Sequence, residues 1–277
     1  RNCKKVWTPK QYQKEITHPQ AIETVQLFIP FQGASAVQKL YVLVSLDATR
    51  GNILHLSTNY TQHQTGDSLR YSYKGNTEPT MHHRDIVQKV DMREAQFLRR
   101  SQFDEIQYGS AVLKRNGKGA ILRPVITAHG HFRILKIRYP DVKTHIISHE
   151  CFLRGAIITA WADQFRQQQG ELWFVEEEIS DSNADTPWHF KGTTYHGWWQ
   201  NQWQRWEQGN NCKMVCLLTG ASLERGANVS LATSRCFITW LTDQHDFTQS
   251  ALLSAGRVTQ MLTSLALKYN ESLTPSC

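Results

Sequence analysis

Three carboxylates, Asp47, Glu150 and Glu224, occupy positions that would suit metal-dependent phosphodiester chemistry. Asp47 ends a run of branched and aromatic apolar residues, where burying a carboxylate is costly unless it is paired, hydrogen-bonded or bound to a metal. Glu150 follows a predicted strand over 142–148, and Glu224 lies at the start of a predicted helix over 223–241. About three carboxylates around ions roughly 3.5–4 Å apart can clamp the attacking and leaving oxygens. The sequence therefore predicts that Asp47, Glu150 and Glu224 bind Mg²⁺ or Mn²⁺ and are catalytic.

Other interpretations of these acids remain open. Asp141 is an alternative for the second position and Glu207 for the third. Carboxylates also occur at strand ends and helix N-termini simply because they interact favourably with the helix dipole. The run Glu176–Glu178 is predicted to be a solvated strand end.

Histidines form the second group with chemical potential. His129 and His131 would share a face if their segment is a strand, and His145 and His149 are four residues apart. Neutral imidazoles bind transition metals, so a histidine-rich metal site is conceivable. The alternative is that these histidines are half-exposed and structural. Cys212 and Cys216 have no second cysteine pair, which disfavours zinc.

Basic and aromatic residues suggest contact with nucleic acid. The formal charge is +7, which alone is a weak signal. Lys114, Arg115 and Lys118 surround an Asn-Gly turn that is either a phosphate-contacting finger or a solvated turn. Trp199, Trp203 and Trp206 have near-helical spacing in a segment over 189–208, which predicts either a buried aromatic helix face or a base-stacking platform. DNA-binding roles are accordingly predicted for Lys114, Arg115, Lys118, Trp199 and Trp203.

The elements that would position these residues follow from hydrophobic periodicity. Residues 40–58 predict a hairpin with a polar turn at 48–52, and its first strand lacks strict alternation, which indicates a central strand buried on both faces. Helices are predicted over 85–103, 151–168, 189–208, 223–241 and 249–269, and strands over 120–127, 142–148, 171–179 and 212–218; 22–31 is a possible short strand, and 132–138 is a short helix or a strand continuation. This order predicts an α/β fold with a mixed, RNase H-like sheet flanked by helices, spanning 17–277 with an insertion at about 59–118.

Composition bounds the protein class. With 277 residues, 40% hydrophobic and 20% charged, the chain can bury a large core, and no apolar run approaches the roughly 20 residues that cross a bilayer. Six cysteines are too sparse for a disulfide scaffold, so a reducing compartment is expected. The chain begins with Arg1 and shows no signal peptide, which is consistent with a fragment or a processed product.

Four stretches resemble bacterial insertion-sequence transposases that place a zinc ribbon before an RNase H-like DDE domain. They are RNCKKVWT at the start, LYVLVSLDATRGNILHLSTN, HIISHECFLRGAIITAW and LERGANVSLATSR. The resemblance implies that Asp47 is the first acid and Glu224 the third. It departs at the second position, where an Asp is usual and this chain has His149-Glu150. Residues 1–16 would be a remnant of the ribbon, whose partner knuckle is missing, so Zn²⁺ binding is not expected without it.

Two functions from different classes follow. The first is DNA cleavage and strand transfer with Mg²⁺, by a homo-oligomer on DNA in the bacterial cytoplasm. The alternative is a non-catalytic nucleic-acid- or protein-binding accessory protein of a mobile element or virus, with a degenerate acid set. A third possibility, a secreted glycoprotein, would require the sequons at Asn59, Asn228 and Asn270 to be occupied.

Overall fold

A computed structural model describes residues 18–33, 36–62, 85–103, 119–181, 185–220 and 224–273. The strands are β1 (Ala21–Gln32), β2 (Val37–Asp47), β3 (Ile53–Thr58), β4 (Tyr60–Thr61), β5 (Ala120–Ile121), β6 (Thr144–Ser148), β7 (Glu171–Glu178), β8 (His189–His196), β9 (Asn201–Gln208) and β10 (Asn211–Thr219). The α-helices are α1 (Ile86–Phe103), α2 (Pro124–Arg138), α3 (Cys151–Ala160), α4 (Ala162–Arg166), α5 (Ala232–Thr242), α6 (His245–Thr248) and α7 (Ala255–Leu273). Two 3₁₀ helices, η3 (Glu224–Asn228) and η4 (Ser250–Leu252), lie before α5 and α7.

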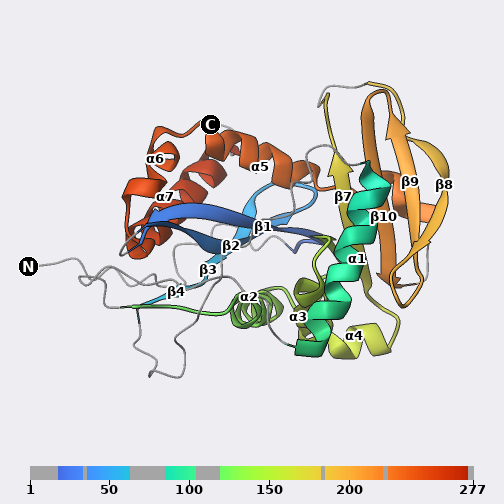
Figure 1. Cartoon of the computed structure of the whole chain (residues 1–277), viewed down its shortest axis with the longest axis horizontal. Coiled ribbons are helices and arrows are strands. Elements are labelled where there is room, and N and C mark those ends of the chain that lie inside the picture. Colours follow the sequence, from blue (N-terminus) through green and yellow to red (C-terminus); the bar gives the residue numbers. More distant parts are fainter. Residues whose placement is uncertain are drawn as a thin grey trace, which may run out of the picture.

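One sheet of eight strands runs through the molecule in the order β3-β2-β1-β6-β7-β10-β9-β8 (Figure 1). Strand β1 pairs antiparallel with β2 and parallel with β6, and β6 pairs parallel with β7. Three consecutive antiparallel strands (β1, β2 and β3), followed by two strands parallel to β1 (β6 and β7), are the RNase H-like arrangement. The predicted mixed α/β fold is therefore confirmed. Strands β8, β9 and β10 extend the sheet beyond β7 as an antiparallel block.

Helices cover both faces of the sheet, and β2 shows how the sequence specifies this. Leu40, Val42, Val44 and Leu46 belong to the core beneath α5 and α7, whereas Tyr41 and Leu43 belong to the core beneath α1, α2 and α3. Every residue from Leu40 to Asp47 is buried. The prediction of a hairpin whose first strand is buried on both faces is therefore confirmed.

The aromatic segment over 189–208 is not a helix, contrary to the prediction. It forms the hairpin β8–β9, with Gly197 at its turn in a left-handed conformation (φ +77°). Its Thr, Tyr and Trp residues favour strands, and the helical spacing of the tryptophans is a coincidence. Trp203 points into the core beneath α1, whereas Trp206 packs against the core on the opposite face.

Other predicted boundaries also change. Only Ala120 and Ile121 form a strand in the segment predicted over 120–127, because Pro124 begins α2, and Pro is well suited to the first turn of a helix. The helix predicted over 223–241 is split into η3 and α5, and the last helix begins at Ala255. The basic turn at 114–118 and the remnant at 1–16 lie outside the described residues. Among the helices that the structure describes, none is long and apolar enough to cross a membrane.

Candidate functional site

Asp47 organises the turn between β2 and β3. Its Oδ1 accepts hydrogen bonds from the backbone N–H groups of Thr49 at 2.8 Å and Arg50 at 3.2 Å. Its own N–H donates to the carbonyl of Asn52 at 3.0 Å, and its carbonyl accepts from the N–H of Gly51 at 2.8 Å. The side chain is buried, and these bonds compensate its desolvation. Turn formation alone accounts for a buried carboxylate at this position.

Asp47 and Glu150 lie at opposite ends of the strands: Asp47 is level with the first residues of β1 and β6, and Glu150 lies beyond the last residue of β6. Asp47 pairs with Ile22 at the start of β1, and Ile22 pairs with His145 near the start of β6. Glu150 follows His145 by five residues of extended chain, which is about 16 Å along the strand direction at about 3.3 Å per residue. This separation is too large for the two carboxylates to share one metal or a pair of ions about 4 Å apart.

The remaining acids do not complete a metal site. Glu150 is buried at the N-cap of α3, where it accepts a hydrogen bond from the thiol of Cys151 at 3.4 Å. Glu224 begins η3, and its side chain lies outside the described part of the structure. Of the alternatives, Asp141 is exposed before β6, and Glu207 on β9 pairs with Arg205. Within the described residues, no three His, Cys, Asp or Glu side chains converge as metal ligands, so Asp47 and Glu150 do not fit the predicted Mg²⁺ or Mn²⁺ site.

A buried carboxylate that the sequence analysis missed lies on β1. Glu23 accepts hydrogen bonds from the backbone N–H and the hydroxyl of Ser234, both at 2.9 Å, and from the N–H of Thr233 at 3.4 Å. Burial raises the pKa of Glu23, and these hydrogen bonds partly offset the increase. Glu23 thus satisfies the first N–H groups of α5 and stabilises its N-terminus. The available signal was that Glu23 is the one charged residue of this strand.

The run Glu176–Glu178 is not a solvated strand end. Glu176 pairs with Arg93 of α1 at 3.2 Å, and Glu178 pairs with Lys89, also of α1. The side chain of Glu177 points to the opposite face, where it accepts a hydrogen bond from the N–H of Leu231 at 3.0 Å and pairs with Arg235. Because alternate residues of a strand face opposite sides, this run fastens α1 to one face of the sheet and α5 to the other.

The histidine pairs do not form the conceivable metal site. His129 and His131 lie on α2, not on a strand, so His129 is exposed while His131 is buried between Ser45 and Ser57, at 2.8 and 2.9 Å. His145 is buried, with its ring centroid 4.3 Å from that of Trp161. Burial lowers the pKa of His131 well below its usual range and that of His145 to about 3. These imidazoles are neutral core groups.

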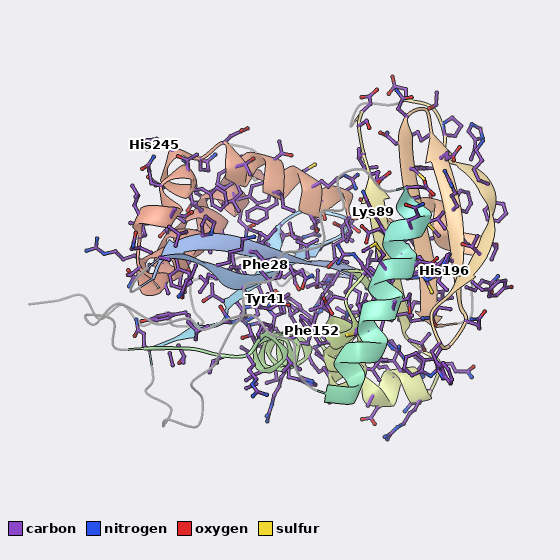
Figure 2. The ribbon with its side chains drawn as sticks, viewed as in Figure 1. Phe28, Tyr41, Lys89, Phe152, His196 and His245 are labelled. Carbon is purple, nitrogen blue, oxygen red and sulfur yellow. The ribbon has the colours of Figure 1, made fainter. Side chains whose placement is uncertain are left out.

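A polar cluster joins α1 to the β8–β9 hairpin. The Nε2 of His149 donates to Oε1 of Glu94 at 3.0 Å, and the amide of Asn201 donates to the same oxygen at 3.3 Å. One turn away on α1, Oδ1 of Asp91 lies 2.6 Å from Nδ1 of His196. Burial lowers the pKa of His149, and the hydrogen bond to Glu94 partly offsets this. Figure 2 shows His196 on the hairpin beside α1.

The turn of this hairpin exposes two adjacent tryptophans. Trp198 is 74% exposed and Trp199 57% exposed, and the guanidinium of Arg154 on α3 lies 5.6 Å from the ring centroid of Trp199. Trp203, which was predicted to contact DNA with Trp199, is fully buried against Phe174, so it has no surface on which a base could stack. Of the two predicted stacking residues, only Trp199 has an accessible ring.

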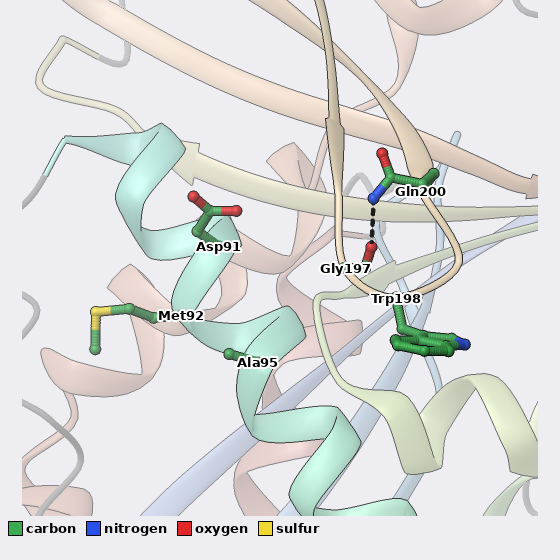
Figure 3. Close-up of a pocket in the computed structure, with 6 residues that line it drawn as sticks. All are labelled: Asp91, Met92, Ala95, Gly197, Trp198 and Gln200. Atoms are coloured by element: carbon green, nitrogen blue, oxygen red, sulfur yellow. Dashed lines mark hydrogen bonds between the residues drawn. The ribbon is translucent and has the colours of Figure 1, made fainter.

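A pocket of about 740 Å³ lies between α1 and this turn (Figure 3). Asp91, Met92 and Ala95 line it from α1, and Gly197, Trp198 and Gln200 line it from the turn. The amide of Gln200 donates to the carbonyl of Gly197 at 3.0 Å, which braces the turn. The pocket is open to solvent and combines one carboxylate and one amide with apolar and aromatic side chains.

No known family pattern matches this chain. A search of curated proteins finds no relative either. Asp91, His196 and Trp198 were missed by the sequence analysis because the predicted helix hid the hairpin turn that brings them together. The adjacent Gly197 and Trp198, followed by a second tryptophan, were the signal for an exposed turn.

Proposed function

We propose that this chain is a nucleic-acid-binding module built on an RNase H-like fold, in which unpaired bases stack on Trp198 and Trp199. One observation carries the proposal: two adjacent indole rings, 74% and 57% exposed, stand at a turn beside the guanidinium of Arg154. Exposing such large apolar rings to water is unfavourable, so a cluster of them marks an interaction site.

The chemistry of this cluster suits single-stranded nucleic acid. Every base offers a π-face, and base–aromatic stacking contributes about 1–3 kcal/mol per base. Arg154 can contact a phosphate or stack on a base while its charge lies over the ring of Trp199. The net charge of +7 adds a favourable, sequence-independent attraction to phosphates.

This proposal corresponds to the alternative function given by the sequence analysis, a non-catalytic nucleic-acid-binding protein. Asp47 and Glu150, the first two acids of the predicted catalytic triad, lie at opposite ends of the strands and are too far apart to share a metal. The exposed aromatic turn needs no metal and lies in the β-strand block added after β7. A non-catalytic nucleic-acid-binding module is the function that agrees with both observations.

Fluorescence anisotropy with a labelled single-stranded oligonucleotide of about 15 nucleotides tests the proposal. The variant Trp198→Ala/Trp199→Ala is expected to bind at least about tenfold more weakly than the wild type, because two stacking contacts are lost. The matched control is Leu252→Ala, which removes a side chain that is 71% exposed at the α6–α7 end, on the other side of the fold from β8 (Figure 1). Unchanged affinity in the double variant would refute the proposal.

Metal-dependent DNA cleavage and strand transfer is a second candidate function. The observation in its favour is that Glu150 is buried directly after β6, in a sheet with RNase H-like strand order. The test is nicking of labelled DNA in Mg²⁺ or Mn²⁺ by the wild type, Glu150→Gln and Asp47→Asn. This function predicts that Glu150→Gln abolishes cleavage and that Asp47→Asn retains it. Absence of cleavage in the wild type would exclude it under those conditions.

A further inference from the structure

The pocket beside Trp198 contains a carboxylate that is held in place before any ligand arrives. Oδ1 of Asp91 lies 2.6 Å from Nδ1 of His196, and Nε2 of the same imidazole lies 2.8 Å from the hydroxyl of Thr194. His196 and Thr194 share one face of β8, and His196 is buried. A carboxylate fixed by a buried imidazole loses little conformational freedom when it binds a ligand.

Asp91 nevertheless remains open to solvent. Its side chain is 64% exposed, and Figure 3 places it on α1 opposite the turn that carries Gly197 and Trp198. An ionised carboxylate has about four lone-pair positions on two oxygens, so the bond to His196 leaves acceptors for a ligand. The pocket between them is open on one side, so a flat base can enter it from solvent.

The charge of Asp91 limits which part of a nucleic acid it can contact. A carboxylate repels the phosphate backbone, so next to a base-stacking turn it is favourable only where it meets hydrogen-bond donors. On a base, these donors are ring N–H and exocyclic amino groups. Guanine presents an N–H and an NH₂ side by side on its Watson–Crick edge, which matches the two oxygens of a carboxylate. Thymine has one such N–H and adenine and cytosine have only the amino group.

We propose that the pocket formed by Asp91, Gly197, Trp198 and Gln200 is a guanine-binding subsite. An unpaired guanine stacks on Trp198 and donates its N1–H and N2–H to Asp91. The turn between β8 and β9 supplies the ring surface and α1 supplies the carboxylate. This inference rests on the proposed nucleic-acid-binding function, and it adds base selectivity to it.

The test compares single-stranded thymidine oligomers of about 15 nucleotides that carry one central dG, dA, dC or dT. The expected result is at least about fivefold tighter binding of the dG oligomer than of the other three, because a bidentate pair discriminates by about that factor or more. In Asp91→Asn, which replaces an acceptor oxygen by a donor, the ratio of dG to dT affinities should fall to about one. The matched control is Asp163→Asn, which removes the same charge from an acid that is 89% exposed on α4, and it should keep the ratio.

The outcomes separate the inference from the function beneath it. Equal affinity of the wild type for all four oligomers, or a dG preference that survives Asp91→Asn, overturns the guanine subsite and leaves the binding module standing. Failure of the wild type to bind any oligomer overturns both. A second variant, Trp198→Ala, should weaken binding of all four oligomers, since stacking is shared by every base. A loss of affinity confined to the dG oligomer would contradict the stacking of other bases on Trp198.

Discussion

His149, which follows β6, and Glu94, on α1, are joined by a buried hydrogen bond of 3.0 Å, and both side chains are almost fully excluded from solvent. The imidazole is enclosed by the rings of Phe97, Phe174 and Trp203. Because a buried carboxylate that loses its partner is strongly destabilised, this contact fixes α1 relative to the sheet. The amide of Asn201, at the start of β9, donates to the same carboxylate at 3.3 Å and so ties α1 to the β8–β9 turn, the other side of the pocket.

Gly197→Ala is expected to destabilise the protein by about 3 kcal/mol. Gly197 has a left-handed backbone (φ +77°), and a Cβ there would lie 2.3 Å from Oε2 of Glu94. The matched control is Gly209→Ala in the β9–β10 turn, which has φ +57° and no neighbour within 4 Å of the added carbon. That control should lose only about 1 kcal/mol, the cost of the backbone conformation. Urea unfolding of both variants measures the difference, and equal losses would show that Glu94 does not occupy this space.

Asp47→Ala is expected to cost about 2 kcal/mol of stability, whereas Asp47→Asn should cost less than about 1 kcal/mol. The amide oxygen of Asn can still accept the hydrogen bonds from the N–H groups of Thr49 and Arg50, and Ala cannot. Thermal and urea unfolding measure both changes. Equal destabilisation by the two substitutions would argue that the charge of Asp47, not its turn-forming bonds, is what the fold requires.

Acid should destabilise the protein in part through His145. The folded pKa of about 3 lies below the unfolded value near 6.5, so between these values the unfolded state binds more protons and stability falls as pH decreases. This group contributes a slope of about 1.4 kcal/mol per pH unit in that window. His145→Phe, which keeps a ring against Trp161, should reduce the slope of the unfolding free energy between pH 6 and 4 by about that amount.

His129→Gln is the matched control for the acid prediction. His129 is exposed on α2, so its replacement removes one imidazole without disturbing the buried ring of His145. If His145→Phe and His129→Gln have the same slope as the wild type, His145 is protonated in the folded state at these pH values, contrary to its burial.

Lys213 is expected to make the protein more stable as pH rises from about 8 to 10.5. Its Nζ donates to the carbonyls of Ala227 and Val229 at 2.6 and 2.7 Å, 4.5 Å from the ring centroid of Trp188, and burial lowers its pKa to about 8. Above this pKa the folded lysine loses its proton while the unfolded lysine keeps it up to about 10.5, so the desolvation cost is relieved over that window. Lys213→Met should abolish this rise in urea unfolding experiments, and a rise that persists in the variant would assign it to other groups.

The sequence predicted those parts of the fold that local signals determine. The apolar run before Asp47 and the polar turn after it predicted the β2–β3 hairpin. The short β-branched stretch before Glu150 predicted β6, and the four-residue apolar spacing after Glu150 predicted the helix that follows. What local signals do not contain is strand direction and order. β1 was expected only as a possible short strand, although it is the central strand of the RNase H-like part. Because β2 was taken as the first strand instead, Asp47 was expected at the same end of the strands as Glu150.

The site was less predictable than the fold because it depends on contacts distant in sequence. Asp91 meets His196 across 105 residues, and Glu94 meets His149 across 55. Trp199 was predicted to contact nucleic acid, but the same interpretation included Trp203, which tertiary packing buries. The spacing of aromatic residues alone did not distinguish a helix face from a hairpin turn.

Photo-crosslinking tests the central claim of base stacking at the β8–β9 turn most directly. Single-stranded DNA containing 5-iodo-deoxyuridine is irradiated with the wild-type chain, and the crosslinked residue is identified by mass spectrometry. The account predicts crosslinks at Trp198 or Trp199, which carry the exposed rings beside Arg154. Crosslinks confined to residues outside the β8–β9 turn, with none on either tryptophan, would contradict it.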